Sequence, residues 1–192
     1  KEANYYTEEI RRIIKDSYGF DKLYAEGLSI KSALDVEYQL HALSALRSGI
    51  ESYDKRHGWR GPILNTKLVA NWKKKLKEKK IDTSLGWKFA KIINVKESEI
   101  IFKILNEDEL GIIQSVNLKW AIKKTIYDSF NINDIIFVSK NSKKIWELKQ
   151  YPKVNGAIVA IDPHNGKVKA LVGGFSFESS EFNRVTQAKR QP

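Results

Sequence analysis

The sequence predicts an α+β fold with helices in its first part, a small five-stranded β-barrel in its middle and a β-hairpin near its end. Apolar residues recur at helical spacing over residues 4–50, whereas short β-branched runs divided by polar turns occupy residues 87–150. Hydrophobic residues make up 42% of the 192 residues, which is enough for a packed core. A disordered or fibrous chain is therefore excluded.

The first part of the chain predicts two helices and a short strand. A helix over residues 4–18 ends at Gly19, which suits a left-handed stop. Leu28 and Ile30 alternate with polar residues and indicate a short strand, and Asp35 then caps a second helix. The row of residues on the buried face of this helix is Val36, Leu40, Leu43, Arg47 and Ile50.

The middle of the chain predicts a small β domain. Residues 54–62 are dense in Gly, Pro and charge, which indicates a loop and a domain boundary, and residues 68–80 predict a short Lys-rich helix. Five strands and one further helix, over residues 120–126, follow. The strands are 87–95, 99–105, 110–116, 134–140 and 144–150. This order fits a partly open barrel of the oligonucleotide/oligosaccharide-binding (OB) type, and a five-stranded sandwich gives a similar pattern.

The last part predicts a β-hairpin. Residues 156–162 and 167–173 form two apolar runs, and Asn165-Gly166 between them favours a tight turn. The pair Gly173-Gly174 lacks the spacing of a phosphate-binding loop and is interpreted as the break that ends the hairpin.

Composition narrows the classes of protein further. The chain has no cysteine, so a disulfide framework and a thiolate metal site are excluded. It also lacks a run of the roughly 18–20 apolar residues that a membrane-spanning helix needs. Because it begins at Lys1, contains no Met and stops at Pro192, we expect it to be a piece of a longer protein.

Neither the histidines nor the acidic residues predict a metal site. His41, His57 and His164 share no metal-ligand spacing, and no carboxylate pattern joins them. The three consecutive acids Glu107, Asp108 and Glu109 lie between apolar runs and favour a solvated turn over a cation or acid/base cluster. We therefore predict neither a metal nor a cofactor.

A lysine cluster leaves three interpretations open. Its members are Lys73, Lys74, Lys75, Lys77, Lys79 and Lys80. With Trp72, Trp87 and Phe89 it could bind single-stranded nucleic acid. However, 27 of the 34 basic residues are Lys, whereas nucleic-acid grooves often use Arg. We favour a solvated helix face, ahead of contact with an anionic polymer or lipid headgroup and ahead of nucleic acid.

Four segments resemble one family. Residues 156–177 and 182–192, which end in Arg-Gln-Pro, resemble the opening of the transpeptidase domain of class A penicillin-binding proteins, the 1A type in particular. Residues 27–35 and 53–62 resemble two earlier segments of that family, with Ser32-Ala33 in place of the usual Thr pair. Residues 63–150 correspond to the family only by their position, because such proteins carry an inserted barrel domain there.

The resemblance implies a domain organisation. An OB-like barrel over residues 63–150 would be inserted between two short flanking segments of a transpeptidase domain. Residues 1–62 would be a linker and the opening segment of that domain, and residues 151–192 its first hairpin and the segment before its active site.

The resemblance also implies that no catalytic residue lies in this chain. The family's serine nucleophile is expected beyond Pro192. The required Ser-x-x-Lys pattern occurs once here, at Ser52 and Lys55, where a helix runs into a charged loop, and two fixed positions arise often by chance. Ser-x-Asn occurs at Ser115 and Asn117, and Lys-Ser/Thr-Gly does not occur. We expect this chain to be inactive by itself.

The function implied is that of a non-catalytic regulatory and linker portion of a peptidoglycan synthase. The parent would be a glycosyltransferase and penicillin-sensitive D,D-transpeptidase that acts on peptidoglycan precursors and glycan strands. It would work on the periplasmic side of the inner membrane, anchored by an N-terminal helix outside this chain. A periplasmic or outer-membrane regulatory protein could dock on the barrel.

The alternatives are an OB-type nucleic-acid-binding module, which we do not expect, and a structural spacer. A docking surface predicts exposed apolar and aromatic residues on the barrel. A nucleic-acid binder predicts a basic groove lined by stacked rings, and a spacer predicts neither.

Overall fold

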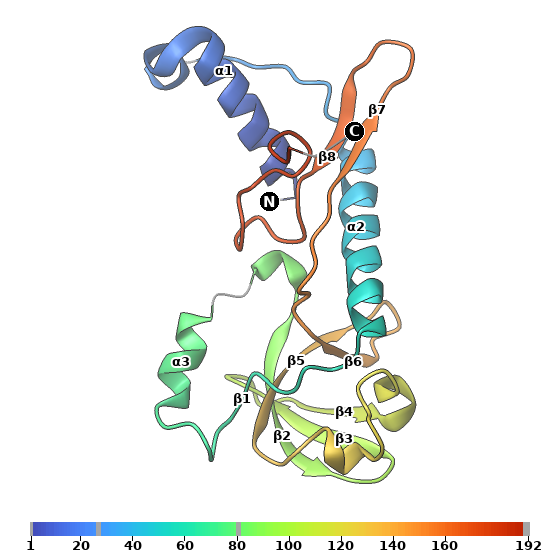
Figure 1. Cartoon of the computed structure of the whole chain (residues 1–192). Helices are drawn as coiled ribbons and strands as arrows, with labels where there is room; N and C mark the ends of the chain where they lie inside the picture. The colour runs from blue at the N-terminus through green and yellow to red at the C-terminus, as the bar shows by residue number, and fades with distance from the viewer. Residues whose placement is uncertain (1, 26–27, 80–81, 190–192) are drawn as a thin grey trace. The chain divides into compact units, whose positions relative to one another are not determined.

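The computed structural model describes residues 2–25, 28–79 and 82–189. The chain divides into two compact units (Figure 1). Residues 51–153 form the inserted unit, and residues 1–50 and 154–192 together form the terminal unit. The inserted unit therefore extends beyond the predicted barrel of residues 63–150 at both ends.

The inserted unit contains a six-stranded antiparallel sheet with the order β1-β5-β2-β3-β4, in which β6 also pairs with β5. Its strands are β1 (Leu64–Asn65), β2 (Lys88–Val95), β3 (Glu99–Ile104), β4 (Leu110–Gln114), β5 (Asp134–Lys140) and β6 (Trp146–Lys149). Phe137 of β5 pairs with Phe89 of β2 and with Lys149 of β6, so these two neighbours lie on opposite edges of β5.

The five predicted strands are confirmed as β2 to β6, but the barrel is not closed. Among the described residues, β4 pairs with β3 alone and does not pair with β1 or β6. The strand β1 was not predicted because two residues are too short to show an alternating pattern.

The predicted helix over residues 120–126 is wrong. Two short 3₁₀ helices, η2 (Ser115–Leu118) and η3 (Ile126–Asp128), lie on either side of an irregular stretch. Thr125 caps η3, since its backbone N–H and its hydroxyl each donate to an Asp128 carboxylate oxygen at 2.8 Å. This capping box starts a new element where the apolar spacing suggested a continuous one.

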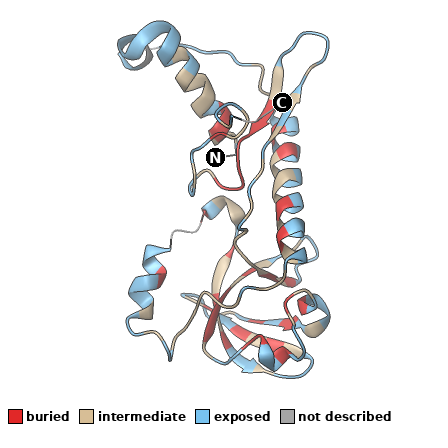
Figure 2. Cartoon of the chain, viewed as in Figure 1, coloured by how far each residue is buried: buried red, intermediate tan, exposed pale blue. Residues whose placement is uncertain are grey.

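The core of the inserted unit is apolar and continuous (Figure 2). Ile92 of β2 pairs with Phe102 of β3, and both are fully buried. Gly111 of β4 makes room for this packing, because a Cβ there would overlap the Phe102 ring and lie 2.9 Å from Nε1 of Trp146. Burial of each such side chain contributes about 1.5–3 kcal/mol.

The terminal unit contains α1 (Asn4–Tyr24), most of α2 (Val36–Arg56) and a two-stranded sheet of β7 (Ile158–Ile161) and β8 (Val168–Val172). The stop at Gly19 is confirmed, because Gly19 has φ +83° and interrupts α1. A second short helical piece then continues to Tyr24, which the sequence did not indicate.

The strand predicted around Leu28 and Ile30 is wrong. Residues 28–35 form no strand, and these two side chains are exposed. A backbone hydrogen bond to β8 is made only from Asp35 onward, where its N–H donates to the Lys169 carbonyl at 2.9 Å. Because this segment has no partner strand, its alternating apolar side chains do not lie on the face of a sheet.

The cap of α2 is confirmed, but its buried face is rotated from the predicted row. Asp35 Oδ1 accepts the N–H groups of Glu37 and Tyr38, whereas Val36 and Leu40 are exposed. Gln39 is buried instead. Its side-chain oxygen accepts the Leu171 N–H at 2.9 Å, and its nitrogen donates to the Leu171 carbonyl at 3.1 Å. The Gln39 amide thus serves the edge of β8 as a neighbouring strand would.

The hairpin of β7 and β8 is confirmed. Gly166 adopts φ +69° in its turn, and the Asp162 carboxylate accepts from the His164 N–H and the Asn165 side chain. The pair Gly173-Gly174 does end β8, and close packing explains both glycines. A Cβ on Gly173 would lie 2.9 Å from the Asn183 Cα, and one on Gly174 would overlap the Tyr5 hydroxyl.

Candidate functional site

The Ser-x-x-Lys pattern lies at the end of α2. Ser52 is exposed there, and the Lys55 ammonium lies 5.6 Å from the centre of the Trp120 ring. Ser115 and Asn117 lie in η2. No side-chain hydrogen bond joins the described Ser52 to Lys55 or to Asn117.

The three histidines lie apart from one another. His41 Nε2 lies 3.7 Å from Glu37 on the exposed face of α2, His57 Nδ1 lies 2.9 Å from the Tyr53 carbonyl, and His164 lies in the hairpin turn. Within the described residues, no group of three or more His, Cys, Asp or Glu side chains could hold a metal ion.

The acidic triplet forms an exposed, ion-paired turn. Each acid lies 2.7 Å from a lysine on a strand, in the pairs Lys88–Glu107, Lys103–Asp108 and Lys140–Glu109. The hydrogen bonds from Lys103 and Lys140 lower the pKa of Asp108 and of Glu109, respectively. Both carboxylates are therefore charged at neutral pH and already balanced by a lysine.

A polar cluster around Asp54 joins the two ends of the inserted unit. The buried Asp54 carboxylate accepts two hydrogen bonds from Arg60 at 2.9 Å, one from the Gln150 side chain at 2.8 Å and one from the Lys153 N–H at 3.1 Å. Arg60 also donates to the Tyr151 carbonyl at 2.6 Å. We call Asp54, Arg60, Gln150 and Lys153 the junction cluster.

The junction cluster keeps Asp54 charged. Burial raises the pKa of this carboxyl, but the hydrogen bonds from Arg60, Gln150 and the Lys153 backbone outweigh burial and leave the pKa below its ordinary value. The ion pair fixes the point where the chain enters the inserted unit next to the point where it leaves. The sequence could not reveal it, because Gln150 is 96 residues from Asp54.

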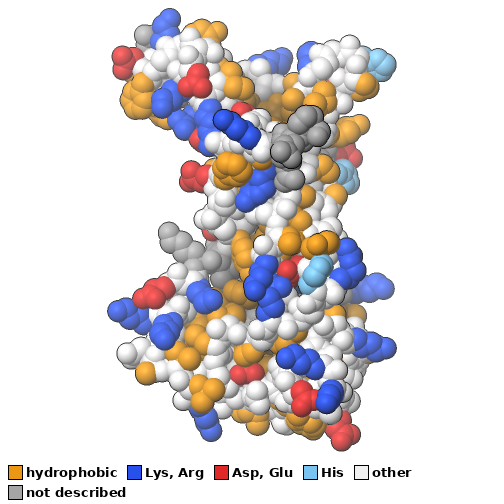
Figure 3. All heavy atoms as spheres, in the orientation of Figure 1, with side chains coloured by type: hydrophobic (Ala, Val, Ile, Leu, Met, Phe, Trp, Pro, Cys, Tyr) orange, Lys and Arg blue, Asp and Glu red, His pale blue; other side chains and the backbone are white. Residues whose placement is uncertain are grey.

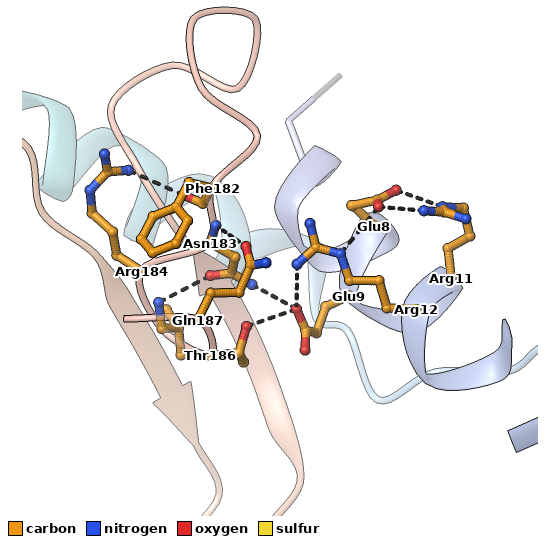
Figure 4. A network of polar contacts seen from close by, with 10 residues as sticks. Glu8, Glu9, Arg11, Arg12, Phe182, Asn183, Arg184, Thr186 and Gln187 are labelled. Atoms are coloured by element: carbon orange, nitrogen blue, oxygen red, sulfur yellow. Dashed lines mark hydrogen bonds and ion pairs between the residues drawn. The ribbon is translucent and has the colours of Figure 1, made fainter. Parts of the chain in front are cut away.

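A second polar network joins α1 to the segment near the end of the chain (Figure 4). The Glu9 carboxylate accepts from the Asn183 side chain at 3.0 Å and from the Thr186 hydroxyl at 2.8 Å. Asn183 is itself buried, and its backbone N–H donates to the Gln187 side chain at 2.7 Å. Residues 182–187, part of the motif that resembles the family's segment before its active site, are thus held to α1 of the same unit.

The lysine cluster lies on α3 (Trp72–Glu78), which is shorter than the predicted helix of residues 68–80. Asn71 before it has φ +55°, which excludes a continuous helix from Leu68. Lys73, Lys74, Lys75, Lys77 and Lys79 are all exposed, and Lys80 lies outside the described residues.

A groove lies beside α3. It has a volume of about 230 Å³ and is lined by Trp72, Lys73, Leu76, Lys77, Phe89, Leu105 and Asn106. Its apolar surface comes from α3, from β2 and from the residue that follows β3. We call it the α3 groove.

A comparison with known protein families identifies the family of this chain. The family profile "Penicillin-binding protein OB-like domain" matches residues 59–154, half of the chain. The chain therefore belongs to the penicillin-binding protein OB-like domain family. The expected OB-like domain is confirmed by this match, but its sheet is open and does not close into a barrel.

Particular relatives are penicillin-binding proteins 1A. The chain is 36% identical over 194 aligned residues to penicillin-binding protein 1A of Rickettsia typhi, covering 99% of this chain and 24% of that protein. It is 30% identical to the protein of the same name from Pseudomonas aeruginosa, and the match covers 99% of this chain and 24% of that protein. The chain spans about a quarter of the length of these relatives.

A solved structure agrees with this result. The crystal structure of penicillin-binding protein 1A from Haemophilus influenzae matches with a TM-score of 0.77 and 26% identity, over 96% of this chain and 28% of that one. Among the described residues, no helix is both long and apolar enough to traverse a bilayer. The resemblance to class A penicillin-binding proteins inferred from the sequence motifs is thus confirmed.

Proposed function

We propose that this chain is a non-catalytic linker and docking portion of a bifunctional peptidoglycan synthase. The longer protein would combine a glycosyltransferase with a penicillin-sensitive D,D-transpeptidase, whose serine nucleophile would follow Pro192. It would act on peptidoglycan precursors and glycan strands on the periplasmic side of the inner membrane, held there by a helix that precedes Lys1. The names and lengths of the relatives support this proposal.

The observation that carries the linker role is the junction cluster. Because the Asp54 carboxylate accepts the Lys153 N–H at 3.1 Å, the chain enters and leaves the inserted unit at nearly one point. A domain whose ends are adjacent can be inserted into, or removed from, a host domain without separating the host's own segments. The inserted unit is therefore suited to carry a separate task beside the transpeptidase.

The docking role is supported by exposed apolar side chains on the inserted unit. Leu110 and Ile112 on β4 are 61% and 49% exposed, and the α3 groove presents further apolar surface. The nucleic-acid alternative is less well supported. Trp87 is buried, and Phe89 stacks on Phe137 at 5.1 Å, so these rings do not form an exposed row for bases.

Labelling with a fluorescent penicillin tests the absence of an active site. We expect no covalent label on this chain and stoichiometric label on the longer protein, since the nucleophile is expected outside the chain. Stoichiometric labelling of this chain that is lost on Ser52→Ala would overturn the proposal.

Excision tests the linker role. In the longer protein, residues 55–152 are replaced by a short Gly-Ser linker between Asp54 and Lys153. We expect acylation by penicillin to stay within about twofold of the unmodified protein, because the two ends already meet. Loss of acylation in an otherwise folded protein would show that the inserted unit is part of the transpeptidase machinery.

A further inference from the structure

Five lysines of the inserted unit form close ion pairs, each with its ammonium 2.7 Å from a carboxylate; they are Lys88, Lys96, Lys103, Lys140 and Lys149. The described lysines on α3 and directly after it form no such pair. Among the described residues, none of Lys73, Lys74, Lys75, Lys77 and Lys79 has a carboxylate within 4.0 Å, although Glu78 lies in the same helix.

What distinguishes α3 is density, because five of the seven residues 73–79 are lysines, which concentrates positive charge at one place. Figure 3 shows several basic side chains over α3, at the lower left of the view. Neighbouring like charges repel one another, and a nearby anion offsets that repulsion. Elsewhere in the same unit, carboxylates take this role beside the paired lysines. An anionic partner would supply the negative charge that offsets the lysines of α3.

The α3 groove provides an apolar site within this charge. Leu76 is buried at its base, and Trp72 and Phe89 are partly exposed along it. Lys73 and Lys77, one turn apart, form its basic side. Its volume of about 230 Å³ is below the roughly 300–1,000 Å³ of small-molecule sites, so it suits one large side chain of a polypeptide.

The floor of the groove is already ordered. Phe89 stacks on Phe137 with ring centres 5.1 Å apart, and Phe137 contacts Trp87 at 5.6 Å. The Leu105 N–H donates to the Phe89 carbonyl at 2.9 Å, which fixes the two strands that carry the floor. A side chain entering the groove would therefore meet a surface that needs little rearrangement.

We propose that the α3 groove binds an acidic segment of a partner protein, with one aromatic or large aliphatic side chain inserted between Trp72 and Phe89. The carboxylates on either side of that anchor pair with Lys73 and Lys77, and with the other α3 lysines. This inference rests on the docking role proposed above and gives that role a location and a partner chemistry.

The probe is a short fluorescein-labelled peptide of Glu and Asp residues around a central Phe, titrated against the purified chain by fluorescence anisotropy. The variants are Trp72→Ala and Lys77→Glu in the groove. Lys124→Glu is the control, because Lys124 is exposed, lies in the inserted unit away from the groove lining and changes the net charge by the same amount as Lys77→Glu. Thermal unfolding of each variant verifies that it is folded.

We expect Lys77→Glu and Trp72→Ala each to weaken binding about tenfold, because each removes a contact inside the groove. Lys124→Glu should change binding less than about twofold, because surface charges are screened beyond about 8 Å at physiological salt. Replacing the central Phe by Ser in the peptide should also weaken binding about tenfold.

Three outcomes would overturn the inference. Equal effects of Lys77→Glu and Lys124→Glu would show general attraction to the +11 charge of the chain. No effect of the Phe-to-Ser change would show that no apolar anchor is used. Tighter binding to phosphatidylglycerol vesicles or to a single-stranded oligonucleotide than to the peptide, sensitive to Lys77→Glu, would assign the groove to a membrane surface or to nucleic acid. The penicillin-labelling result is independent of all three, so a failure here is distinguishable from a failure of the proposed function.

Discussion

The inserted unit and the terminal unit have apolar cores of different size. In the inserted unit, side chains from successive strands form one apolar core, and Phe102, Ile136 and Leu148 are almost completely buried. In the terminal unit the apolar cluster is smaller, and polar side chains also bond to backbone groups of distant segments. Tyr5 donates to the Ser180 carbonyl at 2.6 Å, and Arg47 donates to the Phe175 carbonyl at 3.0 Å.

The cause of this difference is sheet size. An isolated two-stranded hairpin has too little area to form a core, so β7 and β8 depend on α1, α2 and the last segment of the chain. Those segments are distant in sequence, as the 171 residues between Tyr5 and Ser176 show. The comparison teaches that the inserted unit has one large core built mainly from its sheet, whereas the terminal unit combines a smaller apolar cluster with long-range hydrogen bonds to backbone groups.

The largest expected effect is the loss of a core ring from the inserted unit. Phe102→Ala should destabilise this unit by about 3–5 kcal/mol, since it removes a fully buried side chain and leaves a cavity. Hydrogen exchange should show faster opening in β2 to β6 and unchanged protection in β7 and β8. Phe175→Ala, at a position equally buried in the terminal unit, is the matched variant and should give the reverse pattern. If either substitution accelerates exchange equally in both units, the two units are not independent.

A smaller effect is expected at the junction cluster. Asp54→Asn should destabilise the inserted unit by about 2–3 kcal/mol near neutral pH, because it leaves the charge of Arg60 without its partner. Asp108→Asn is the control, since that carboxylate is fully exposed and its removal should leave the unfolding midpoint unchanged.

The effect of Asp54→Asn should depend on pH. The pKa of Asp54 is lowered in the folded protein, so its stabilising effect is complete above the unfolded value of about 3.9 and is lost as the pH falls through the folded value. Urea unfolding of wild type and variant should therefore converge at acidic pH, below about pH 4. A constant difference between the two from pH 7 to pH 2 would show that the Asp54 charge does not carry the effect.

The smallest expected effect concerns the network of Figure 4. Glu9→Ala should cost about 1–2 kcal/mol, because the buried Asn183 side chain loses its acceptor. Glu8→Ala is the neighbouring control. Glu8 pairs with Arg11 and Arg12 within α1 itself, and its removal should cost less than about 0.5 kcal/mol.

Amide exchange at residues 183–187 provides the measurement. It should accelerate in Glu9→Ala and remain as in wild type in Glu8→Ala. Equal acceleration in both variants would mean that α1 acts through its helicity rather than through the Glu9 contacts.

Local patterns in the sequence determined most of the regular elements of this protein. The strands β2 to β6, the Asn-Gly hairpin, the stop at Gly19 and the cap at Asp35 all depend on residues within a few positions of one another, and each was predictable. The motifs that indicated the family are of the same local kind. The absence of a catalytic set in this chain stays a prediction from those motifs.

The tertiary structure alone decided which faces are buried and which polar groups meet. The alternation at Leu28 and Ile30 has no partner strand, and Gln39 takes a buried place because the edge of β8 needs a hydrogen-bonding neighbour. The junction cluster and the α3 groove likewise join residues far apart in the chain. The physical reason is that the energy of a buried hydrogen bond or apolar contact depends on partners that local sequence does not specify.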